Sequence, residues 1–181
     1  LDDLAETIIM RLIRGSSFEG YQGIPETSTF NDVTIIRPFI NVSKESLKLY
    51  QETYQVSYRE DASNQEDDYT RNRFRHQIMP LLEKENPQYL DKFMQFHEYQ
   101  SNAYALIDRE SQRYFESLSH ETDSISFNAG DFNEQLEILQ METIKKIVNQ
   151  ITENQVELSY QNLKDIIDVV HHEKPHVNYH L

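Results

Sequence analysis

The sequence predicts a mainly α-helical chain, and three observations support this fold class. Apolar side chains recur at the spacing of an α-helix in residues 1–14, and again over about 30 residues from Pro87 onward. Two further helical patterns lie near residues 132–151 and 159–172. Only two short runs, residues 33–39 and 124–129, have the composition of a β-strand. Helices should therefore make up most of the structure.

The first helix is predicted over residues 1–14. Its apolar positions Leu4, Ile8 and Leu12 lie one above the other, Ala5 and Ile9 widen this stripe, and the glycine at position 15 is placed to end the helix. The opposite face carries Asp2, Asp3, Glu6, Thr7, Arg11 and Arg14. We expect one side to face a core and the other to form a face of acids and arginines.

The next segments alternate between loops and short elements. Residues 15–26 hold three of the four glycines of the chain, which predicts a loop with demanding backbone angles. Residues 33–39 favour an edge strand stopped by Pro38, and Ser43 is placed to cap a helix that runs to about Tyr54. Residues 59–69 are acidic and aperiodic, typical of a loop. A helix follows near Thr70, and Pro80 should kink or end it.

The pattern from Pro87 to about Leu118 predicts one long helix. At a rise of 1.5 Å per residue, about 30 residues make a rod of about 45 Å, and such a rod usually links two bodies. We therefore expect a boundary inside it and divide the chain into residues 1–85, a linker helix over residues 86–118, and a small helical domain over residues 119–181.

Composition and charge restrict the classes of function. The net charge is −14, which argues against a surface that binds nucleic acid all over. Most of the basic residues lie in the first half, so contacts with phosphate should be local. There is no cysteine, which excludes disulfides and thiol chemistry, and no apolar run is long enough to span a bilayer. We expect a soluble, cytoplasmic protein without a membrane partner.

Three groups of residues could carry chemistry. Asp2, Asp3 and Glu6 could together hold a cation, a substrate ammonium or a Mg²⁺-bound nucleotide, although acids in a first helical turn also simply complement the helix dipole. The stretch Thr70–His76 places Arg71 and Arg75 on one helical surface, with Asn72 close to it. Guanidinium groups suit phosphate, but a solvated helix paired with the preceding acids is an equally good interpretation.

The third group is the set of histidines near the C-terminus. They are His171, His172, His176 and His180. Zinc is disfavoured there because Pro175 interrupts the helix and no further ligand is placed by a motif. Phosphate-loop, dinucleotide-binding, nucleophile-elbow and zinc-protease motifs are also absent from the sequence.

The order of several motifs is more informative than any one of them. "LDDLAETIIMRLIRGS", then "IIRPF", then "SYREDASNQEDDYTRNRFRHQIMPLLEKENP" resembles the tRNA(Ile)-lysidine synthetases over about the first 90 residues. The resemblance implies an α/β ATP-pyrophosphatase (PP-loop) domain of the adenine-nucleotide α-hydrolase-like type, followed by helical domains that grip tRNA. It also implies the reaction: the wobble cytidine of tRNA(Ile) is adenylated with ATP and Mg²⁺, and the ε-amine of L-lysine then displaces AMP.

The resemblance also assigns roles to residues. The family's H-x-x-D-D-x-x-E-T element falls on Asp2, Asp3, Glu6 and Thr7. This implies that Asp3 and Glu6 are catalytic and handle the lysine ammonium or the metal, and that Asp2 binds the substrate. Arg11 and Arg14 extend this face toward phosphate, and the R-N-x-x-R element on Arg71, Asn72 and Arg75 implies contact with the anticodon region. The metal ligands stay unassigned.

The resemblance carries further expectations about the whole protein. Residues 1–85 would be the C-terminal remnant of the catalytic domain and residues 119–181 a substrate-recognition domain. The S-G-G-x-D-S loop is missing, so we expect a fragment that is inactive alone, and dimeric members of the family suggest a homodimer. Two alternatives stay open: another PP-loop tRNA-modifying enzyme of the thiolase type, which would commonly carry cysteines, and an acidic helical adaptor without catalysis.

Overall fold

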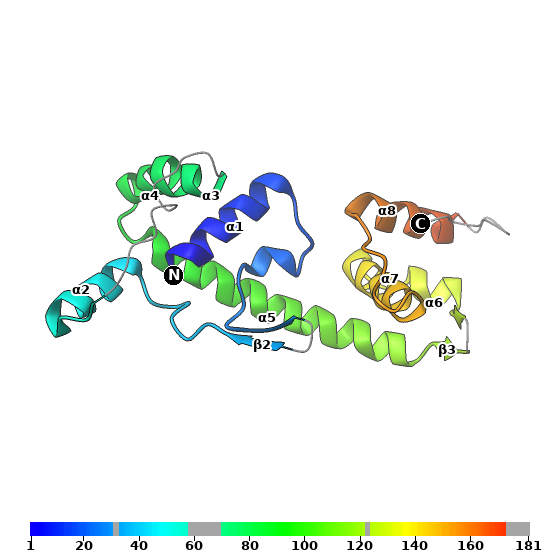
Figure 1. The fold of residues 1–181 in the computed structure, drawn as a ribbon. Helices are drawn as coiled ribbons and strands as arrows, with labels where there is room; N and C mark the ends of the chain where they lie inside the picture. Colours follow the sequence, from blue (N-terminus) through cyan, green and yellow to red (C-terminus); the bar gives the residue numbers. More distant parts are fainter. Residues whose placement is uncertain (31–32, 58–69, 122–123, 173–181) are drawn as a thin grey trace. The chain divides into compact units, whose positions relative to one another are not determined.

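The computed structural model describes residues 1–30, 33–57, 70–121 and 124–172, and they divide into two compact units. Unit 1 is Leu1–Asn102 and unit 2 is Ala103–Leu181. The division falls inside α5 (Tyr89–Glu116), a helix of 28 residues that stands out in Figure 1. The predicted long helix is therefore confirmed, and so is the mainly α-helical fold class. The predicted loop at residues 59–69 lies outside the described residues.

Unit 1 is built on α1 (Asp2–Arg14), which confirms the first predicted helix. Leu4 and Ile8 are fully buried and pack with Ile40, against which Phe93 and Met94 of α5 also lie. Figure 1 shows α1 beside the first half of α5. Gly15 ends the helix with a φ of 83°. The first two turns of α1 thus form the core of unit 1.

The predicted apolar stripe of α1 is wrong at its C-terminal end, and its polar face is wrong at Glu6. Leu12 is 53% exposed, because the residues that cover the helix pack around Leu4 and Ile8. Glu6, placed by the helical pattern on the solvent side, is only 1% exposed. The helical period alone does not show that a second layer of charged side chains covers this face.

The loop after α1 returns to the helix at Gly23, after a short 3₁₀ turn, η1 (Gly20–Gln22). Gly23 has a φ of 90°, and a Cβ atom there would lie 2.6 Å from Leu4 Cδ1. Only glycine combines this backbone angle with such a close approach to the core. The predicted loop is confirmed.

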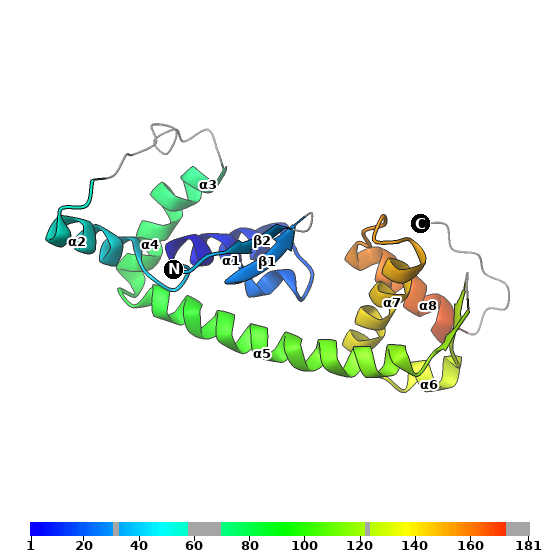
Figure 2. The same ribbon diagram turned by 60° about the horizontal axis from the view of Figure 1, so that its bottom comes forward.

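An antiparallel hairpin follows, formed by β1 (Thr27–Phe30) and β2 (Val33–Ile36) and visible in Figure 2. Thr27 pairs with Ile36, and β2 ends before Pro38, so the predicted strand is confirmed over its first four residues. The sequence did not predict β1, because "TSTF" has too few apolar residues. Ser43 then caps α2 (Lys44–Tyr54) through the backbone N–H of Ser46, as predicted.

The helix predicted near Thr70 forms as α3 (Thr70–Arg73), the π-helical segment η3 (Phe74–Ile78) and α4 (Met79–Glu85). Pro80 does not end it. The backbone N–H of Met79 donates to Phe74 O, five residues back, so the wider π turn lies directly before the proline. The helix therefore continues through Pro80, although proline has no backbone N–H to donate.

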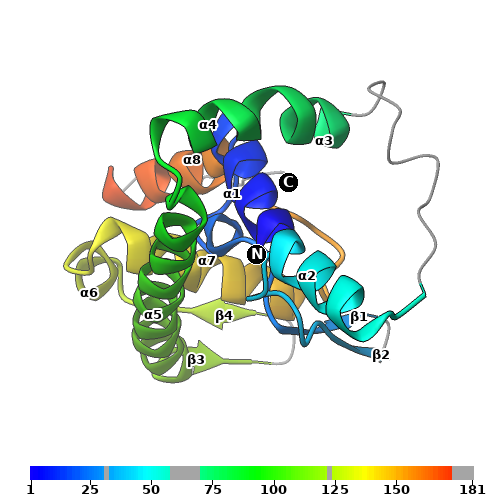
Figure 3. The same ribbon diagram turned by 90° about the vertical axis from the view of Figure 1, so that its left-hand side faces the viewer.

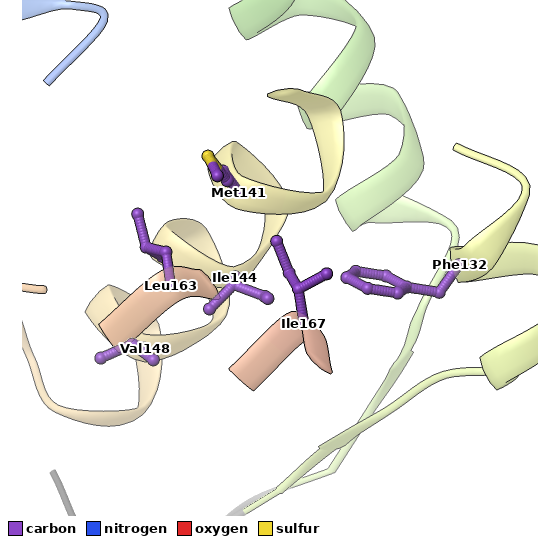
Figure 4. Packing of buried hydrophobic residues seen from close by; sticks show 6 residues of the cluster. All are labelled: Phe132, Met141, Ile144, Val148, Leu163 and Ile167. Atoms are coloured by element: carbon purple, nitrogen blue, oxygen red, sulfur yellow. The ribbon is translucent and has the colours of Figure 1, made fainter. Parts of the chain in front are cut away.

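In its described residues, unit 2 contains the end of α5 and five further elements. They are β3 (Ser119–His120), β4 (Ile125–Ser126), α6 (Ala129–Asn133), α7 (Glu137–Ile151) and α8 (Tyr160–His171). The helix predicted over residues 132–151 is in fact two, because the Asn128 side chain caps α6 early and Leu136 is extended before α7. Figure 4 shows the core, formed by Phe132, Met141, Ile144, Val148, Leu163 and Ile167.

Among the residues that the structure describes, we find no helix with the length and apolar character required to cross a bilayer.

Candidate functional site

A cluster of six charged side chains lies on the outer face of the first turns of α1. Figure 3 shows α1 next to the helix that begins with α3. The members come from three separate segments of the chain. Helix α1 supplies Asp2, Asp3 and Glu6, the first position of α2 supplies Lys44, and the helix of α3 and η3 supplies Arg71 and Arg75. We call them the α1 charge cluster. It contains three acids and three bases.

Glu6 is the buried centre of the α1 charge cluster. Its two oxygens accept hydrogen bonds from Arg75 Nε at 2.7 Å and from Arg71 Nε at 3.0 Å, and Arg75 Nη2 adds a third at 2.9 Å. Hydrogen bonds of this length between a carboxylate and a guanidinium group are charge-assisted and stronger than bonds between neutral groups. The carboxylate therefore fixes both arginines in one orientation.

Asp3 is the exposed acid of the cluster, with 47% of its side chain accessible. Its Oδ1 atom lies 3.0 Å from Arg75 Nη2, 3.3 Å from Arg71 Nη2 and 3.4 Å from Lys44 Nζ. Partial burial alone would raise the pKa of the Asp3 carboxyl, but Lys44, Arg71 and Arg75 together hold that pKa below its usual value. Asp3 is thus a charged acid at neutral pH that solvent can still reach.

Asp2 is the member of the cluster without an ion pair among the described contacts, and Asn72 lies beside the cluster. Asp2 Oδ2 accepts a hydrogen bond of 2.8 Å from the backbone N–H of Lys44, and the backbone nitrogen of Leu1 donates to Val42 O at 2.8 Å. Asn72 is 8% exposed, so it does not present its amide freely to a ligand. Asp2 acts in the structure as the residue that ties the start of α2 to α1.

Arg11 and Arg14 lie apart from this cluster, toward the other end of α1. Arg11 Nη1 donates to the carbonyls of Gly20 and Gly23, the latter at 2.7 Å, and so holds the loop after the helix. It lines a polar pocket of about 580 Å³, together with His97 and Ser101 of α5. Arg14 is exposed. The role of both arginines toward phosphate stays a prediction.

The chemistry of the α1 charge cluster favours a ligand with both an ammonium group and an anionic group. Asp3 and Glu6 already have three cations within 4 Å, so a divalent cation placed between them would be strongly repelled. In the part of the chain that the structure describes, no group of three or more His, Asp or Glu side chains is suited to a metal ion. The cluster does not fit Mg²⁺.

Lys44 is the member of the cluster that sequence reasoning missed. Its Nζ atom lies 3.4 Å from Asp3 Oδ1 and 3.7 Å from Glu6 Oε1. It is separated from these acids by about 40 positions and belongs to no charged run. The sequence does place Lys44 directly after the Ser43 cap, at the first position of α2, where the cap fixes the backbone conformation.

The C-terminal histidines do not gather in the described residues. His172 Nδ1 lies 2.7 Å from Asp168 O, and His171 Nε2 lies 3.3 Å from Gln140 Nε2. His176 and His180 lie outside the described residues. The expectation that this region is not a zinc site stays a prediction.

We expect Asp3 to contribute stability that acid removes. Because the folded-state pKa of Asp3 is lowered, its contribution is present above about pH 4 and is lost as the pH falls through the lowered value. Asp3→Asn should cost at most about 1 kcal/mol at pH 7, since the pairs are half exposed, and should flatten the fall in stability toward pH 3. Urea unfolding at pH 7, 5 and 3 measures this, with Asp91→Asn as the matched loss of one carboxylate. An unchanged acid dependence in Asp3→Asn would contradict the assignment.

Comparison with known proteins finds relatives that match the part of the chain that contains the α1 charge cluster. Residues 1–82 match a family model described as a PP-loop domain. A tRNA(Ile)-lysidine synthase from Geobacillus kaustophilus is 50% identical over 97 residues, which cover 54% of this chain and 21% of that protein. A protein of the same name from Enterococcus faecalis is 43% identical over 110 residues, which cover 61% of this chain and 24% of that protein. Another from Bacillus thuringiensis is 38% identical over 120 residues, which cover 66% of this chain and 24% of that protein.

The matches therefore span less than a quarter of the length of these relatives. They confirm the resemblance stated from the sequence, and they include the segment that supplies the α1 charge cluster, since all its members lie within residues 1–82. The chain thus carries a PP-loop domain match in its first 82 residues, and over 54–66% of its length it is similar to proteins named tRNA(Ile)-lysidine synthase.

Proposed function

We propose that this chain is part of an ATP-dependent ligase that joins L-lysine to C2 of the wobble cytidine of tRNA(Ile). The similarity to proteins named tRNA(Ile)-lysidine synthase supports the reaction class. The observation that carries the proposal is the α1 charge cluster, where one solvent-accessible acid lies among three cations. Such a site suits an amino acid, which brings an ammonium and a carboxylate together.

In this proposal Asp3 touches the substrate. Its carboxylate is ionised and 47% exposed, so it can orient the ε-amine of lysine and accept the proton that the nitrogen loses as it forms the bond to C2. ATP supplies the adenylate, and AMP leaves with the oxygen of the former C2 carbonyl. The α1 charge cluster does not hold Mg²⁺ in this step, because its acids are already paired with three cations.

Glu6 receives a different role from Asp3. At 1% exposure and with two guanidinium groups bonded to it, Glu6 acts through Arg71 and Arg75 and is a positioning residue. Arg71 is 44% exposed and can present its outer edge to a phosphate or to the carboxylate of lysine. Arg75, at 24%, is more enclosed and serves mainly to orient both acids.

The remaining predicted contacts belong to this proposal too. Arg11 and Arg14 would meet nucleotide or RNA phosphate at the far end of α1, and Asn72 would support the helix that faces the anticodon region. Asp2 would keep the start of α2 in place. Residues 1–85 would then belong to the catalytic domain and residues 119–181 to a tRNA-recognition domain, in a cytoplasmic enzyme that forms a homodimer.

The proposal is tested with a chimera. The 97-residue segment of the Geobacillus kaustophilus protein that is 50% identical to this chain is replaced by the matching residues of this chain. With ATP, L-lysine and a tRNA(Ile) transcript, the chimera should form lysidine, detected by nucleoside mass spectrometry. The same chimera with Asp3→Asn should lose at least about tenfold in rate, since a positioned proton acceptor contributes typically 10² or more.

Two controls make the result decisive. Asp91→Asn in the chimera removes an exposed carboxylate of α5 and should leave the rate unchanged. A thermal transition close to that of the parent protein shows that the chimera is folded. A folded chimera that forms no lysidine, or an Asp3→Asn variant as active as Asp91→Asn, would contradict the proposal and favour a helical adaptor.

A further inference from the structure

Lys44 is attached to the first turn of α1 by both its backbone and its side chain. The backbone N–H donates to Asp2 Oδ2 at 2.8 Å, and the side chain then turns toward Asp3 and Glu6. Two residues before Lys44, the carbonyl of Val42 accepts a hydrogen bond of 2.8 Å from the Leu1 backbone nitrogen. The position of Lys44 is therefore fixed by contacts that do not depend on its charged end.

The charged end of Lys44 differs from the two arginines in how tightly it is held. Arg71 and Arg75 contact Glu6 at 3.0 and 2.7 Å through forked guanidinium groups. Lys44 Nζ lies 3.4 Å from Asp3, slightly farther than the 3.0 and 3.3 Å of the arginines, and 3.7 Å from Glu6, which is clearly farther. The Lys44 side chain is 40% exposed, close to the 44% of Arg71. Among these three cations, Lys44 is the one that a competing cation displaces at the lowest cost.

The group that Lys44 places between the two acids is a primary alkylammonium. This is chemically the same as the ε-ammonium of free L-lysine. A flexible stem of four carbons allows Lys44 to swing away without moving the backbone of α2, because its backbone N–H stays bonded to Asp2.

We propose that the ε-ammonium of Lys44 is the built-in occupant of an alkylammonium site beside Asp3, and that an incoming ammonium substrate must displace it. The proposal deepens the proposed function, on which the identity of that substrate rests. Lys44 adds a third cation to the two arginines that already pair with Asp3 and Glu6, and it sets a threshold for occupancy by another ammonium group. Lys44 is therefore a specificity-determining residue whose removal strengthens binding of an alkylammonium.

The test uses the 181-residue chain and the probe n-butylammonium chloride, at ionic strength matched with NaCl. The variant Lys44→Met keeps the length of the side chain and the backbone N–H but removes the charge. Lys48→Met is the matched control, because it removes the same charge from an exposed position one turn later in α2. An exposed ion pair of this kind is worth enough to change a dissociation constant by roughly two- to fivefold.

Two readouts are expected together. In the wild-type chain, n-butylammonium should shift the ¹³Cε signal of Lys44, identified by its loss in Lys44→Arg. The dissociation constant for n-butylammonium should be roughly two- to fivefold lower in Lys44→Met than in either the wild type or Lys48→Met. Lys44→Arg retains a cation and should not show the gain.

Other results overturn the proposal. It fails if Lys44→Met binds n-butylammonium no better than Lys48→Met, if binding becomes weaker, if the ¹³Cε signal of Lys44 does not move, or if no chain binds the probe. The proposed function fails separately: if n-butylammonium binds as expected but L-lysine binds no better than L-norleucine, which lacks the ε-amine, the alkylammonium site stands and lysine is not its substrate.

Discussion

Replacing Glu6 with alanine is expected to lower the free energy of unfolding of unit 1 by about 3 kcal/mol, the scale reported for removing one partner of a buried ion pair. The Glu6 side chain is 1% exposed and its oxygens accept three hydrogen bonds of 2.7 to 3.0 Å from Arg71 and Arg75. Without it, two guanidinium groups lose their acceptor while Arg75 stays 24% exposed and cannot fully return to water.

Hydrogen exchange followed by mass spectrometry in increasing urea measures this effect in each unit. Peptides from α1, α3 and α4 should lose protection in Glu6→Ala, and peptides from α7 and α8 serve as the internal reference. A second variant, Glu6→Met with Arg75→Met, should recover part of the loss, because it removes the unpaired charge together with its partner.

The chain offers a matched control for Glu6. Glu110 of α5 also lies between two arginines, at 3.2 Å from Arg109 and 3.0 Å from Arg113, but it is exposed to solvent. Exposed pairs are screened by water, so Glu110→Ala should cause no measurable change. If Glu6→Ala were as mild as Glu110→Ala, the burial of Glu6 would carry no energetic weight and its positioning role would be wrong.

Local signals in the sequence predicted the ends of several elements correctly. Gly15 ends α1, Ser43 caps α2, and an unbroken apolar period produces α5. Each of these depends on residues within one or two turns, where backbone geometry is decided. The spacing of Arg71 and Arg75 likewise predicted a shared face, and both side chains contact Glu6.

Long-range pairing could not be predicted in the same way. Arg71 and Arg75 meet Glu6 across 65 and 69 positions, and no local pattern states which acid they select. The burial of Glu6 follows from that pairing, so a helical pattern that counts only hydrophobicity places it in solvent. Lys44 joined the cluster through the packing of a third segment. The pairing of these residues depends on three segments that are distant in the sequence, so no local pattern predicts it.

The second large effect is expected in unit 2, where Phe132→Ala should lower the free energy of unfolding by about 3 to 5 kcal/mol. Phe132 is fully buried, its ring lies 4.8 Å from that of Phe127, and it is part of the core with Ile144 of α7 and Ile167 of α8 (Figure 4). Alanine would leave a cavity among the side chains of α7 and α8 that pack on Phe132.

Leu136→Ala is the matched control for Phe132→Ala. Leu136 lies just before α7 and is 72% exposed, so its loss should change stability by less than about 0.5 kcal/mol. Hydrogen exchange in α7 and α8 measures both variants, and equal protection in the two would show that Phe132 does not hold the core.

Protection in α1 decides a further question: if it is unchanged in Phe132→Ala, unit 2 unfolds on its own and is a domain in the thermodynamic sense. If α1 loses protection as well, α5 couples the two units, and the division into a catalytic and a tRNA-recognition domain would be wrong.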